Sequence, residues 1–240
     1  MQTETAQRLL ELNRQFYQTF AAPFSATRQR IQPGVRRLLD RLVAGDSLLD
    51  LGCGNGELAR VLRRHGWTGR YTGVDFSAGL LQDADDAAGV FLQADLASPH
   101  WPERAGIGRQ PFAAICAFAV LHHLPGQALR VQFLRQGKGL LAPDGLLFLS
   151  NWQFLNSPRL AARVQPWGRV GITPESVAPN DYLLDWRSGG NGLRYAHHFT
   201  VDELAGLAGE TGFRVCETFF SDGESGDLGL YQIWAHHPSS

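Results

Sequence analysis

The stretch Leu48-Leu49-Asp50-Leu51-Gly52-Cys53-Gly54-Asn55-Gly56-Glu57-Leu58 decides the fold of this chain. An apolar strand runs into a loop with glycine at every second position, and a helix pattern starts directly after it. Glycine lets the backbone turn sharply and lets a ligand approach the loop amides closely. The helix N-terminus then offers N–H groups to an anionic ligand. The stretch predicts a ligand site at the carboxyl edge of a parallel sheet, although a glycine loop alone also fits a plain turn.

Two more carboxylates follow the next predicted strands. Val74-Asp75 ends the second strand, and Gln93-Ala94-Asp95-Leu96 closes the third. A carboxylate at the position of Asp75 can accept hydrogen bonds from both hydroxyls of a ribose. A carboxylate at the position of Asp95 can accept a hydrogen bond from the amino group of adenine. The dinucleotide fingerprint requires a third glycine where Glu57 stands, so the pattern favours a nucleoside ligand over NAD or FAD.

The composition is that of an ordinary globular protein. The 240 residues carry 22 basic and 23 acidic side chains, for a net charge of −1, and 44% of them are hydrophobic. This excludes disordered, collagenous and disulfide-scaffold classes. The charge is uneven, because residues 1–70 carry +5 and residues 71–240 carry −6. A basic N-terminal end on a near-neutral chain is a weak hint of an anionic partner.

The sequence shows no signal peptide, membrane span or metal-binding cysteine pair. The first ten residues lack the apolar core of a signal peptide. The longest apolar run, Phe112 to Leu121, is half of the roughly 20 residues that span a bilayer. Cys53, Cys116 and Cys216 lie far apart without a CxxC pair, which indicates reduced thiols and no metal site. We therefore expect a cytoplasmic protein without a membrane segment.

Alternating apolar runs and helical patterns predict one doubly wound α/β domain over residues 1–240. Two helices, Thr3–Thr19 and Thr27–Val43, are expected in an N-terminal segment of residues 1–45. The core of residues 46–150 has these expected strands and helices: Ser47–Leu51, Tyr71–Val74, Val90–Leu92, Phe112–Ala117 and Leu146–Ser150 as strands, and Glu57–Arg64, Ala78–Ala84 and Gln127–Leu141 as helices. Residues 151–198 form a predicted substrate lid, because the loop from 166 to 198 is too long for a routine connection. Residues 199–240 hold the expected helix Val201–Glu210 and a hairpin of Phe213–Phe220 with Leu228–Ala235.

The core motifs resemble those of class I S-adenosylmethionine-dependent methyltransferases. DLGCGNGEL, GVDFS, QADL and FAAICAFAVLHHL occur in that family's order and spacing across roughly residues 46–150. The resemblance implies a Rossmann-like sheet of seven strands, mostly parallel, with a final reversed strand. It also implies S-adenosyl-L-methionine as cofactor and S-adenosyl-L-homocysteine as product.

The same resemblance implies roles for the residues in the motifs. Asp50 and the loop amides would surround the methionine part, Asp75 the ribose and Asp95 the adenine, with Phe76 or Leu96 beside the base. The full expected cofactor set is Asp50, Gly52, Cys53, Gly54, Asn55, Gly56, Asp75, Phe76, Ala94, Asp95, Leu96, Ala117 and Phe118.

The flanks are similar to a narrower group, the tRNA wobble-uridine carboxymethyl methyltransferases. The similarity rests on Phe16-Tyr17, the segment from Ala22 to Arg28, the histidines His122 and His123, Trp152, and the segments 181–186 and 193–199. It implies methylation of a carboxylate oxygen on a modified uridine of the anticodon. Some members of that group need a small zinc-binding activator subunit. The stretch Asp181 to Trp186 departs from the group, whose pattern usually has a proline before the tryptophan.

A carboxylate acceptor asks little of the site. It is ionised at pH 7, so it needs no general base. It does need an in-line approach and a clamp, and arginine binds carboxylates bidentately. The expected acceptor site comprises Arg28, His122, Trp152, Asp185, Trp186, Arg194, Tyr195 and His197. Trp186 or Tyr195 would stack on a base. Plain packing is the competing interpretation for the aromatic and histidine side chains of this set.

Three alternatives remain open. A small-molecule methyltransferase on the same scaffold would use Arg28 and Arg194 to bind the carboxylate of a free metabolite. A catalytically silent regulatory subunit that binds S-adenosylmethionine is less consistent with the intact loop and acids. An oxidoreductase is the most distant alternative.

Overall fold

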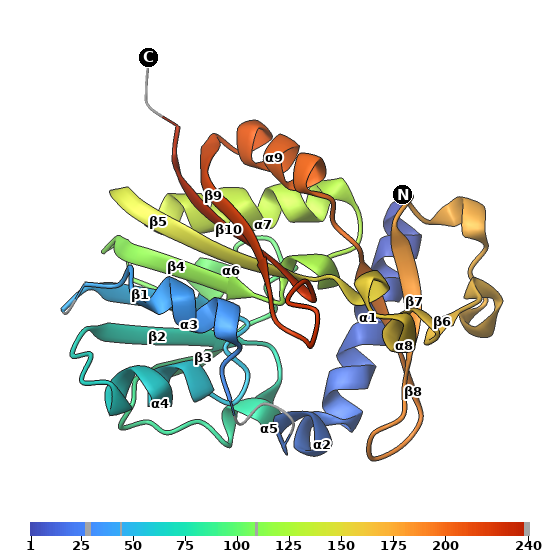
Figure 1. Ribbon diagram of the computed structural model, residues 1–240, viewed down its shortest axis with the longest axis horizontal. Coiled ribbons are helices and arrows are strands. Elements are labelled where there is room, and N and C mark those ends of the chain that lie inside the picture. The colour runs from blue at the N-terminus through green and yellow to red at the C-terminus, as the bar shows by residue number, and fades with distance from the viewer. Residues whose placement is uncertain (27–29, 44, 109, 238–240) are drawn as a thin grey trace.

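Seven strands form the main sheet, in the order β3-β2-β1-β4-β5-β10-β9 (Figure 1). The computed structural model describes residues 1–26, 30–43, 45–108 and 110–237. The strands are β1 (Ser47–Leu51), β2 (Arg70–Asp75), β3 (Val90–Gln93), β4 (Phe112–Phe118), β5 (Leu141–Trp152), β9 (Phe213–Ser221) and β10 (Gly229–His236). The first five pair in parallel, and β10 runs antiparallel to β5 and β9. The predicted, mostly parallel Rossmann-like sheet with a reversed final strand is confirmed.

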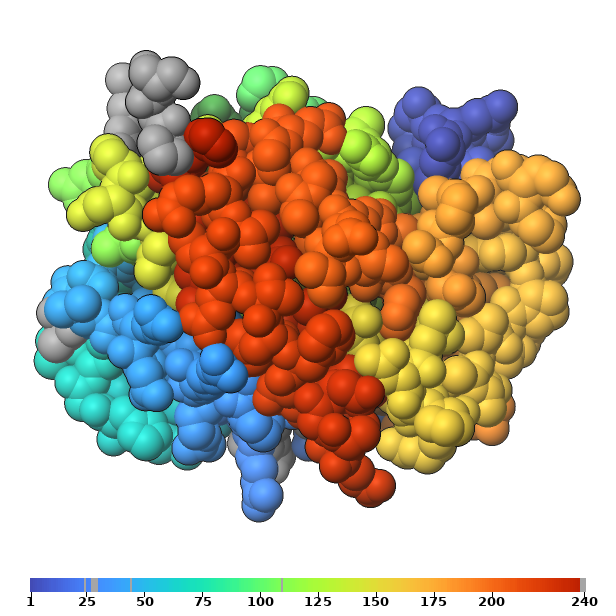
Figure 2. All heavy atoms as spheres, turned by 45° about the horizontal axis from the view of Figure 1, so that its top comes forward, coloured from blue at the N-terminus to red at the C-terminus, as the bar shows by residue number. Residues whose placement is uncertain are grey.

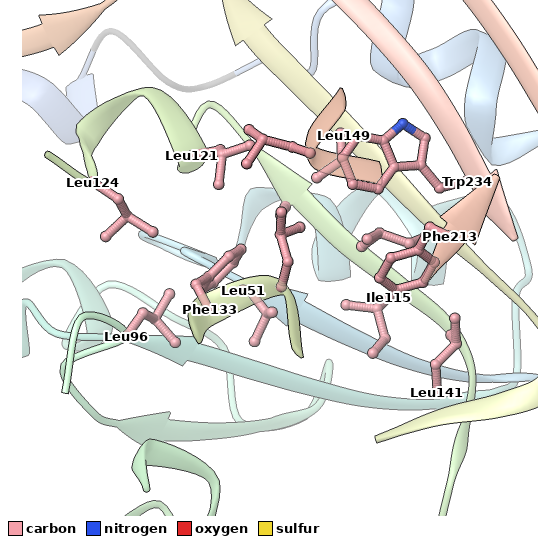
Figure 3. Close-up of a cluster of buried hydrophobic side chains, with 14 of the residues drawn as sticks. Leu51, Leu96, Ile115, Leu121, Leu124, Phe133, Leu141, Leu149, Phe213 and Trp234 are labelled. Atoms are coloured by element: carbon pink, nitrogen blue, oxygen red, sulfur yellow. The ribbon is translucent and has the colours of Figure 1, made fainter. Parts of the chain in front are cut away.

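Helices cover both faces of this sheet. On one face lie α3 (Pro33–Leu39) and α4 (Glu57–Arg64), and on the other lie α7 (Gln127–Leu140) and α9 (Val201–Glu210) (Figure 1). Successive side chains of a strand point to opposite faces. Figure 3 shows the core on the α7 and α9 face, where Leu51, Ile115, Leu149 and Trp234 of the strands belong to one cluster with Phe133 of α7. Burial on both faces explains why the central strands are mostly apolar.

A second sheet lies beyond the carboxyl ends of the parallel strands. It joins β6 (Val164–Gln165), β7 (Asp181–Trp186) and β8 (Gly192–His197) in antiparallel pairs, and α8 (Pro158–Ala161) leads into it. The helices α1 (Thr3–Thr19) and α2 (Ala21–Ala26) lie at the same end (Figure 1). The Asn13 side chain ties α1 to β8, because it accepts from Tyr195 N at 2.8 Å and donates to Tyr195 O at 3.2 Å. The small sheet and α1 therefore form one unit over the strand ends.

Several predicted elements differ from the structure. The loop expected from 166 to 198 contains strands β7 and β8, whose buried charged residues hide the apolar alternation of a strand. Residues 21–23, expected to separate two helices, lie inside α2. The helix expected over 27–43 is the shorter α3, although residues 27–29 lie outside the described part of the chain. The helix α5 (Ala78–Leu81) ends three residues early, and α6 (Trp101–Arg104) was not predicted.

The C-terminal hairpin fixes α3 against the main sheet. Asp222 Oδ1 accepts from Gly34 N at 2.9 Å, and its Oδ2 accepts from the Tyr231 hydroxyl at 2.5 Å. Figure 2 shows this C-terminal segment, in red, between the α3 segment in light blue and the α8 segment in yellow. In the described part of the chain, no helix combines the length and apolarity needed to cross a bilayer.

Candidate functional site

A cavity of about 480 Å³ lies at the carboxyl edge of the main sheet. Its wall comes from α1, the glycine loop, the ends of β2 to β5, the 3-10 turn Leu121–His123, and the facing strands β7 and β8. Pockets of this volume suit ligands the size of a drug or cofactor. The cavity therefore lies where open parallel sheets bind their ligands.

The glycine loop forms one wall of this cavity. Gly52, Gly54 and Gly56 have φ angles of +77°, +55° and +73°, which side-chain-bearing residues rarely adopt. A Cβ on Gly52 would lie 2.4 Å from Val120 Cγ2, whereas a Cβ on Gly54 would meet nothing within 4 Å. The loop thus needs glycine both for its turns and for its close approach to Val120, which follows β4.

Asp75 anchors the loop at the end of β2. Its Oδ2 accepts from Gly54 N at 3.0 Å and its Oδ1 from Ser77 N at 2.8 Å. Burial raises the pKa of this carboxyl, and the two backbone N–H groups act in the opposite direction. A buried acid held in this way has a fixed orientation toward the cavity that it lines.

Asp50 lies at the end of β1 and is buried. Burial raises its pKa to about 7, the Tyr71 hydroxyl lowers it, and the charge of Asp75 raises it further. The Tyr71 hydroxyl donates to Asp50 Oδ2 at 2.5 Å. Buried acids with strongly shifted pKa values cluster at functional sites. The pair at β1 and β2 has this character, and it fits a ligand that carries a positive charge and hydroxyl groups.

Asp95 completes the row of strand-end acids. Its Oδ1 accepts from Ala97 N at 3.0 Å, and its Oδ2 accepts from Arg14 of α1 at 2.8 Å. Arg14 also pairs with Glu11 at 2.5 Å. The helix α1 thus reaches across the cavity to the end of β3.

The structure brings most of the expected cofactor residues together. Those that line the cavity are Asp50, Gly52, Cys53, Gly54, Asn55, Asp75, Phe76, Asp95, Leu96 and Phe118. Gly56 is not among the lining residues, because its α-carbon faces the Phe91 ring and Ala84 instead. Ala94 and Ala117 pack into the core on the α7 face. Donors, acceptors and buried acids in this arrangement suit an adenosyl group that carries a cationic amino acid part.

Arg194 of β8 occupies the opposite wall inside a ring of aromatic side chains. Its guanidinium carbon lies 4.7 Å from the ring centre of Trp152, 5.3 Å from that of Phe16 and 5.5 Å from that of Trp186. Only 6% of the residue is exposed. Aromatic faces stabilise a cation. The arrangement holds a positive charge at the cavity wall without a large solvent surface.

His122 connects the 3-10 turn Leu121–His123 to β5. Trp152 N donates to His122 Nδ1 at 3.4 Å, and both residues line the cavity together with Trp186. An accepting Nδ1 places the ring proton of a neutral His122 on Nε2. Four of the expected acceptor residues, His122, Trp152, Trp186 and Arg194, therefore meet at one wall.

Three other expected acceptor residues do not reach the cavity. In β7 and β8 the side chains alternate, so Asp185, Tyr195 and His197 lie on the face opposite to Trp186 and Arg194. Asp185 pairs with Arg187 at 2.7 Å. The structure thus corrects their expected place in the acceptor site. Arg28 lies outside the described residues.

Tyr195 and His197 belong to a buried charged network. The His197 nitrogens bond to Asp181 Oδ1 at 2.7 Å and to Glu203 Oε1 at 2.8 Å, and the Tyr195 hydroxyl donates to Asp181 at 2.6 Å. Arg130 of α7 lies 3.5 Å from Asp181 and 3.3 Å from Glu203. Burial acts to raise the pKa of both carboxyls, but hydrogen bonds from His197 bring both below their usual values. The network joins the small sheet to α7 and α9.

Two features of the cavity were not predicted from the sequence, namely the Tyr17–His123 hydrogen bond and the side chain of Asn151. His123 Nδ1 bonds to Tyr195 O at 3.2 Å, and its Nε2 bonds to the Tyr17 hydroxyl at 2.7 Å. Because a carbonyl only accepts, Nδ1 carries a proton, and Nε2 of neutral His123 accepts from Tyr17. Asn151 at the end of β5 also lines the cavity. Tyr17 stood in a quoted motif, but no signal in the sequence set Asn151 apart.

The residues described here hold no group of three or more His, Cys, Asp and Glu side chains that suits a metal ion.

Comparison with known proteins identifies the family. The profile of a family described as a methyltransferase domain matches residues 24–218. A putative methyltransferase of Encephalitozoon cuniculi is 29% identical over 210 residues, which cover 84% of this chain and 87% of that protein. The 27-O-demethylrifamycin SV methyltransferase of Amycolatopsis mediterranei is 32% identical over 53% of this chain and 48% of its own length. The tRNA (carboxymethyluridine(34)-5-O)-methyltransferase of Arabidopsis thaliana is 29% identical over 57% of this chain and 31% of its own length.

Solved structures share the fold. A S-adenosylmethionine-dependent methyltransferase of Methanosarcina mazei has a TM-score of 0.65 at 20% identity, over 87% of this chain and 99% of that one. A structure described as the complex of the Haloferax volcanii Trm112 methyltransferase activator with a putative methyltransferase has a TM-score of 0.64 at 16% identity, over 93% of this chain and 97% of that one. The 1,6-didemethyltoxoflavin-N1-methyltransferase of Burkholderia thailandensis, with bound S-adenosylhomocysteine, has a TM-score of 0.62 at 19% identity, over 98% and 90%. The chain therefore belongs to the methyltransferase-domain family, and it shares its fold with S-adenosylmethionine-dependent methyltransferases.

Proposed function

We propose that this protein is an enzyme that uses S-adenosyl-L-methionine as methyl donor and transfers its methyl group to a carboxylate oxygen of an anionic acceptor. The observation that carries the proposal is Arg194, a buried cation at the cavity wall between Trp152 and Trp186. A guanidinium binds carboxylates through N–H groups that lie in its own plane. The rings of Phe16, Trp152 and Trp186 stabilise the cation at this position. Arg194 is thus suited to clamp an acceptor carboxylate.

The acids on the far wall would hold the cofactor. Asp75 would accept the ribose hydroxyls and Asp95 the adenine amino group, while Asp50 and the loop from Gly52 to Asn55 would surround the methionine part. The three acids line the same cavity as Arg194. Cofactor and acceptor would then approach each other from opposite walls.

The proposed reaction needs no proton transfer. Bound S-adenosylmethionine supplies a methyl group on a positively charged sulfur. The acceptor carboxylate is ionised at neutral pH and already nucleophilic, so no side chain has to remove a proton. The chain's own residues orient the carboxylate and exclude water, which are the contributions that proximity catalysis requires.

A modified uridine of tRNA and a free metabolite are both candidate acceptors. The relative from Arabidopsis thaliana, which is named for carboxymethyluridine, supports the first. The relative from Amycolatopsis mediterranei, named for a small molecule, supports the second. Arg30 and Arg163 also line the cavity and add positive charge for either anion. The fold shared with the Haloferax volcanii enzyme makes a small activator subunit part of the tRNA hypothesis.

The test replaces the proposed clamp and measures the rate constant kcat/KM and the affinity for the cofactor product. Arg194→Gln keeps a planar polar end but loses the charge, so kcat/KM for a carboxylate acceptor should fall roughly 100-fold. The affinity for S-adenosylhomocysteine, measured by calorimetry, should stay within about 3-fold of wild type. Arg159→Gln, a change at an exposed arginine of α8, is the matched control. Loss of cofactor binding in Arg194→Gln would show that the two walls are not separate sites.

A second candidate is a methyltransferase for acceptors that must lose a proton. The Tyr17–His123 pair favours it, because both residues line the cavity and their 2.7 Å bond resembles a general base held ready. Phenols and amines are acceptors of this class.

A further inference from the structure

The side chain of Asn151 is a buried amide at the cavity wall with unsatisfied hydrogen-bonding groups. The residue is 1% exposed, and it lines the cavity at the end of β5. Among the described residues, neither Nδ2 nor Oδ1 has a hydrogen-bond partner. Buried polar groups are almost always paired, and an unpaired one lowers the stability of the fold. A buried donor and acceptor at a ligand cavity therefore point to a ligand that pairs with both.

The position of Asn151 assigns it to the acceptor side. In register, Asp50 of β1 pairs with Cys116 of β4, which pairs with Phe148 of β5. Neighbouring strands lie about 4.8 Å apart, so β5 lies about 10 Å from the strand that bears Asp50. Asn151 is adjacent to Trp152, whose ring contacts Arg194 and whose N–H bonds to His122. Asn151 thus lies at the cavity wall, next in the chain to the tryptophan that contacts the proposed clamp and at least two strands away from the cofactor acids.

The chemistry of a carboxamide defines the group it can recognise. Asn151 offers one carbonyl acceptor and an NH₂ donor side by side. The complement is an N–H next to a C=O, as in a primary amide, a lactam or an imide. Asn13 makes this pairing within the same protein, where it binds the N–H and the C=O of Tyr195 at 2.8 Å and 3.2 Å. A simple aliphatic carboxylate has no such edge.

We infer that Asn151 is a specificity-determining residue that binds an N–H/C=O edge of the methyl acceptor while Arg194 holds its carboxylate. This inference rests on the proposed carboxylate methylation and narrows its substrate class. The acceptor is a carboxylate attached to a cyclic amide or imide, and the uracil ring, with its N3–H beside two carbonyls, belongs to this class. An acceptor without that edge leaves a buried amide unpaired, which is a strong basis for rejection.

The experiment compares matched acceptors with labelled S-adenosylmethionine. The acceptors are 5-carboxymethyluridine, its N3-methyl derivative and phenylacetate, and both nucleosides are tested free and within an anticodon stem-loop. The enzymes are wild type, Asn151→Leu and the control Asn156→Leu, which makes the same change at an exposed position five residues later. The readout is the ratio of kcat/KM values, because a general loss of structure would not change a ratio. Binding of S-adenosylhomocysteine verifies that each variant is folded.

Wild type and Asn156→Leu should prefer 5-carboxymethyluridine over its N3-methyl derivative by about 10-fold or more. Asn151→Leu should lose this preference, so that its ratio of kcat/KM values approaches 1. If wild type does not discriminate, methylates phenylacetate alone, or keeps its ratio in Asn151→Leu, the assignment of Asn151 is wrong while carboxylate methylation stands. If wild type methylates none of these carboxylates, the proposed function fails and the inference fails with it.

Discussion

The guanidinium carbon of Arg194 lies 4.7 Å from the ring centre of Trp152, so the small sheet and the main sheet share one cavity wall. Arg194 belongs to β8, where it pairs in register with Leu184, and Trp152 ends β5. Strand alternation places Trp186 on the same side as Arg194 and sends Tyr195 to the other. The acceptor wall therefore depends on how the two sheets pack.

Asp75 should be essential for cofactor binding. Asp75→Asn keeps the size of the side chain but removes the charge that would accept two ribose hydroxyls, and it weakens the bonds to Gly54 N and Ser77 N. We expect the affinity for S-adenosylhomocysteine to fall at least roughly 100-fold in calorimetry. Asp144→Asn, at an exposed site of β5, should bind normally. Unaltered binding by Asp75→Asn would contradict the cofactor assignment.

Asp50 should make the ligand-free protein less stable as the pH rises. Its folded-state pKa of about 7 lies above the ordinary value of 3.8 because of burial, so the folded protein binds the extra proton between these pH values. The stabilising contribution is present below about pH 4 and is lost as the pH rises through about 7. Asp50→Asn still accepts from Tyr71 and should be more stable than wild type at pH 8, by roughly 2 kcal/mol in urea unfolding. Equal pH profiles of the two proteins would contradict this pKa.

The network around Asp181 should have the opposite pH dependence. Burial alone would raise the pKa of Asp181 and Glu203, but bonds from His197 hold both below their usual values. Their contribution is therefore present above the ordinary pKa near 4 and is lost as the pH falls through the lower folded values. Asp181→Asn should cost about 3 kcal/mol of unfolding free energy at pH 7, because Arg130 and His197 remain buried. The difference from wild type should shrink below pH 4, and a difference independent of pH would argue against the network.

Tyr17→Phe separates the two candidate reactions. A carboxylate acceptor has no proton to lose, so kcat should stay within about 5-fold of wild type between pH 6 and 9. A loss of roughly 100-fold or more would show that the Tyr17–His123 pair acts as a base, which favours the second candidate. Steady-state rates across that pH range provide the measurement.

The sequence predicted the main sheet well because its central strands are buried on both faces. Phe112 to Ala117 is a continuous apolar run, Leu48 to Leu51 is apolar except for Asp50, and each is a strand in the structure. The small sheet was missed because Asp181 and Arg194 are buried within its strands, where ionic and aromatic partners replace apolar neighbours. The division of the chain into four segments and the cytoplasmic location stay predictions.

The site was predictable where spacing along the chain fixes geometry. Asp50, Asp75 and Asp95 end successive parallel strands, so their meeting at one edge follows from the topology. The face of β8 was not predictable, because a one-residue shift in strand register exchanges Arg194 with Tyr195. The role of Asn13, which fixes that strand through the backbone of Tyr195, likewise appears only in three dimensions.

The most direct test of carboxylate methylation is the stability of the product to base. The enzyme is incubated with methyl-labelled S-adenosylmethionine and with pools of tRNA or metabolites, and the labelled product is treated with dilute alkali. A methyl ester hydrolyses and releases volatile labelled methanol, whereas methyl groups on nitrogen, carbon or a phenol oxygen remain attached. We predict that the label is released as methanol, and that Arg194→Gln forms little of this product. A label that stays on the acceptor after alkali would contradict carboxylate methylation.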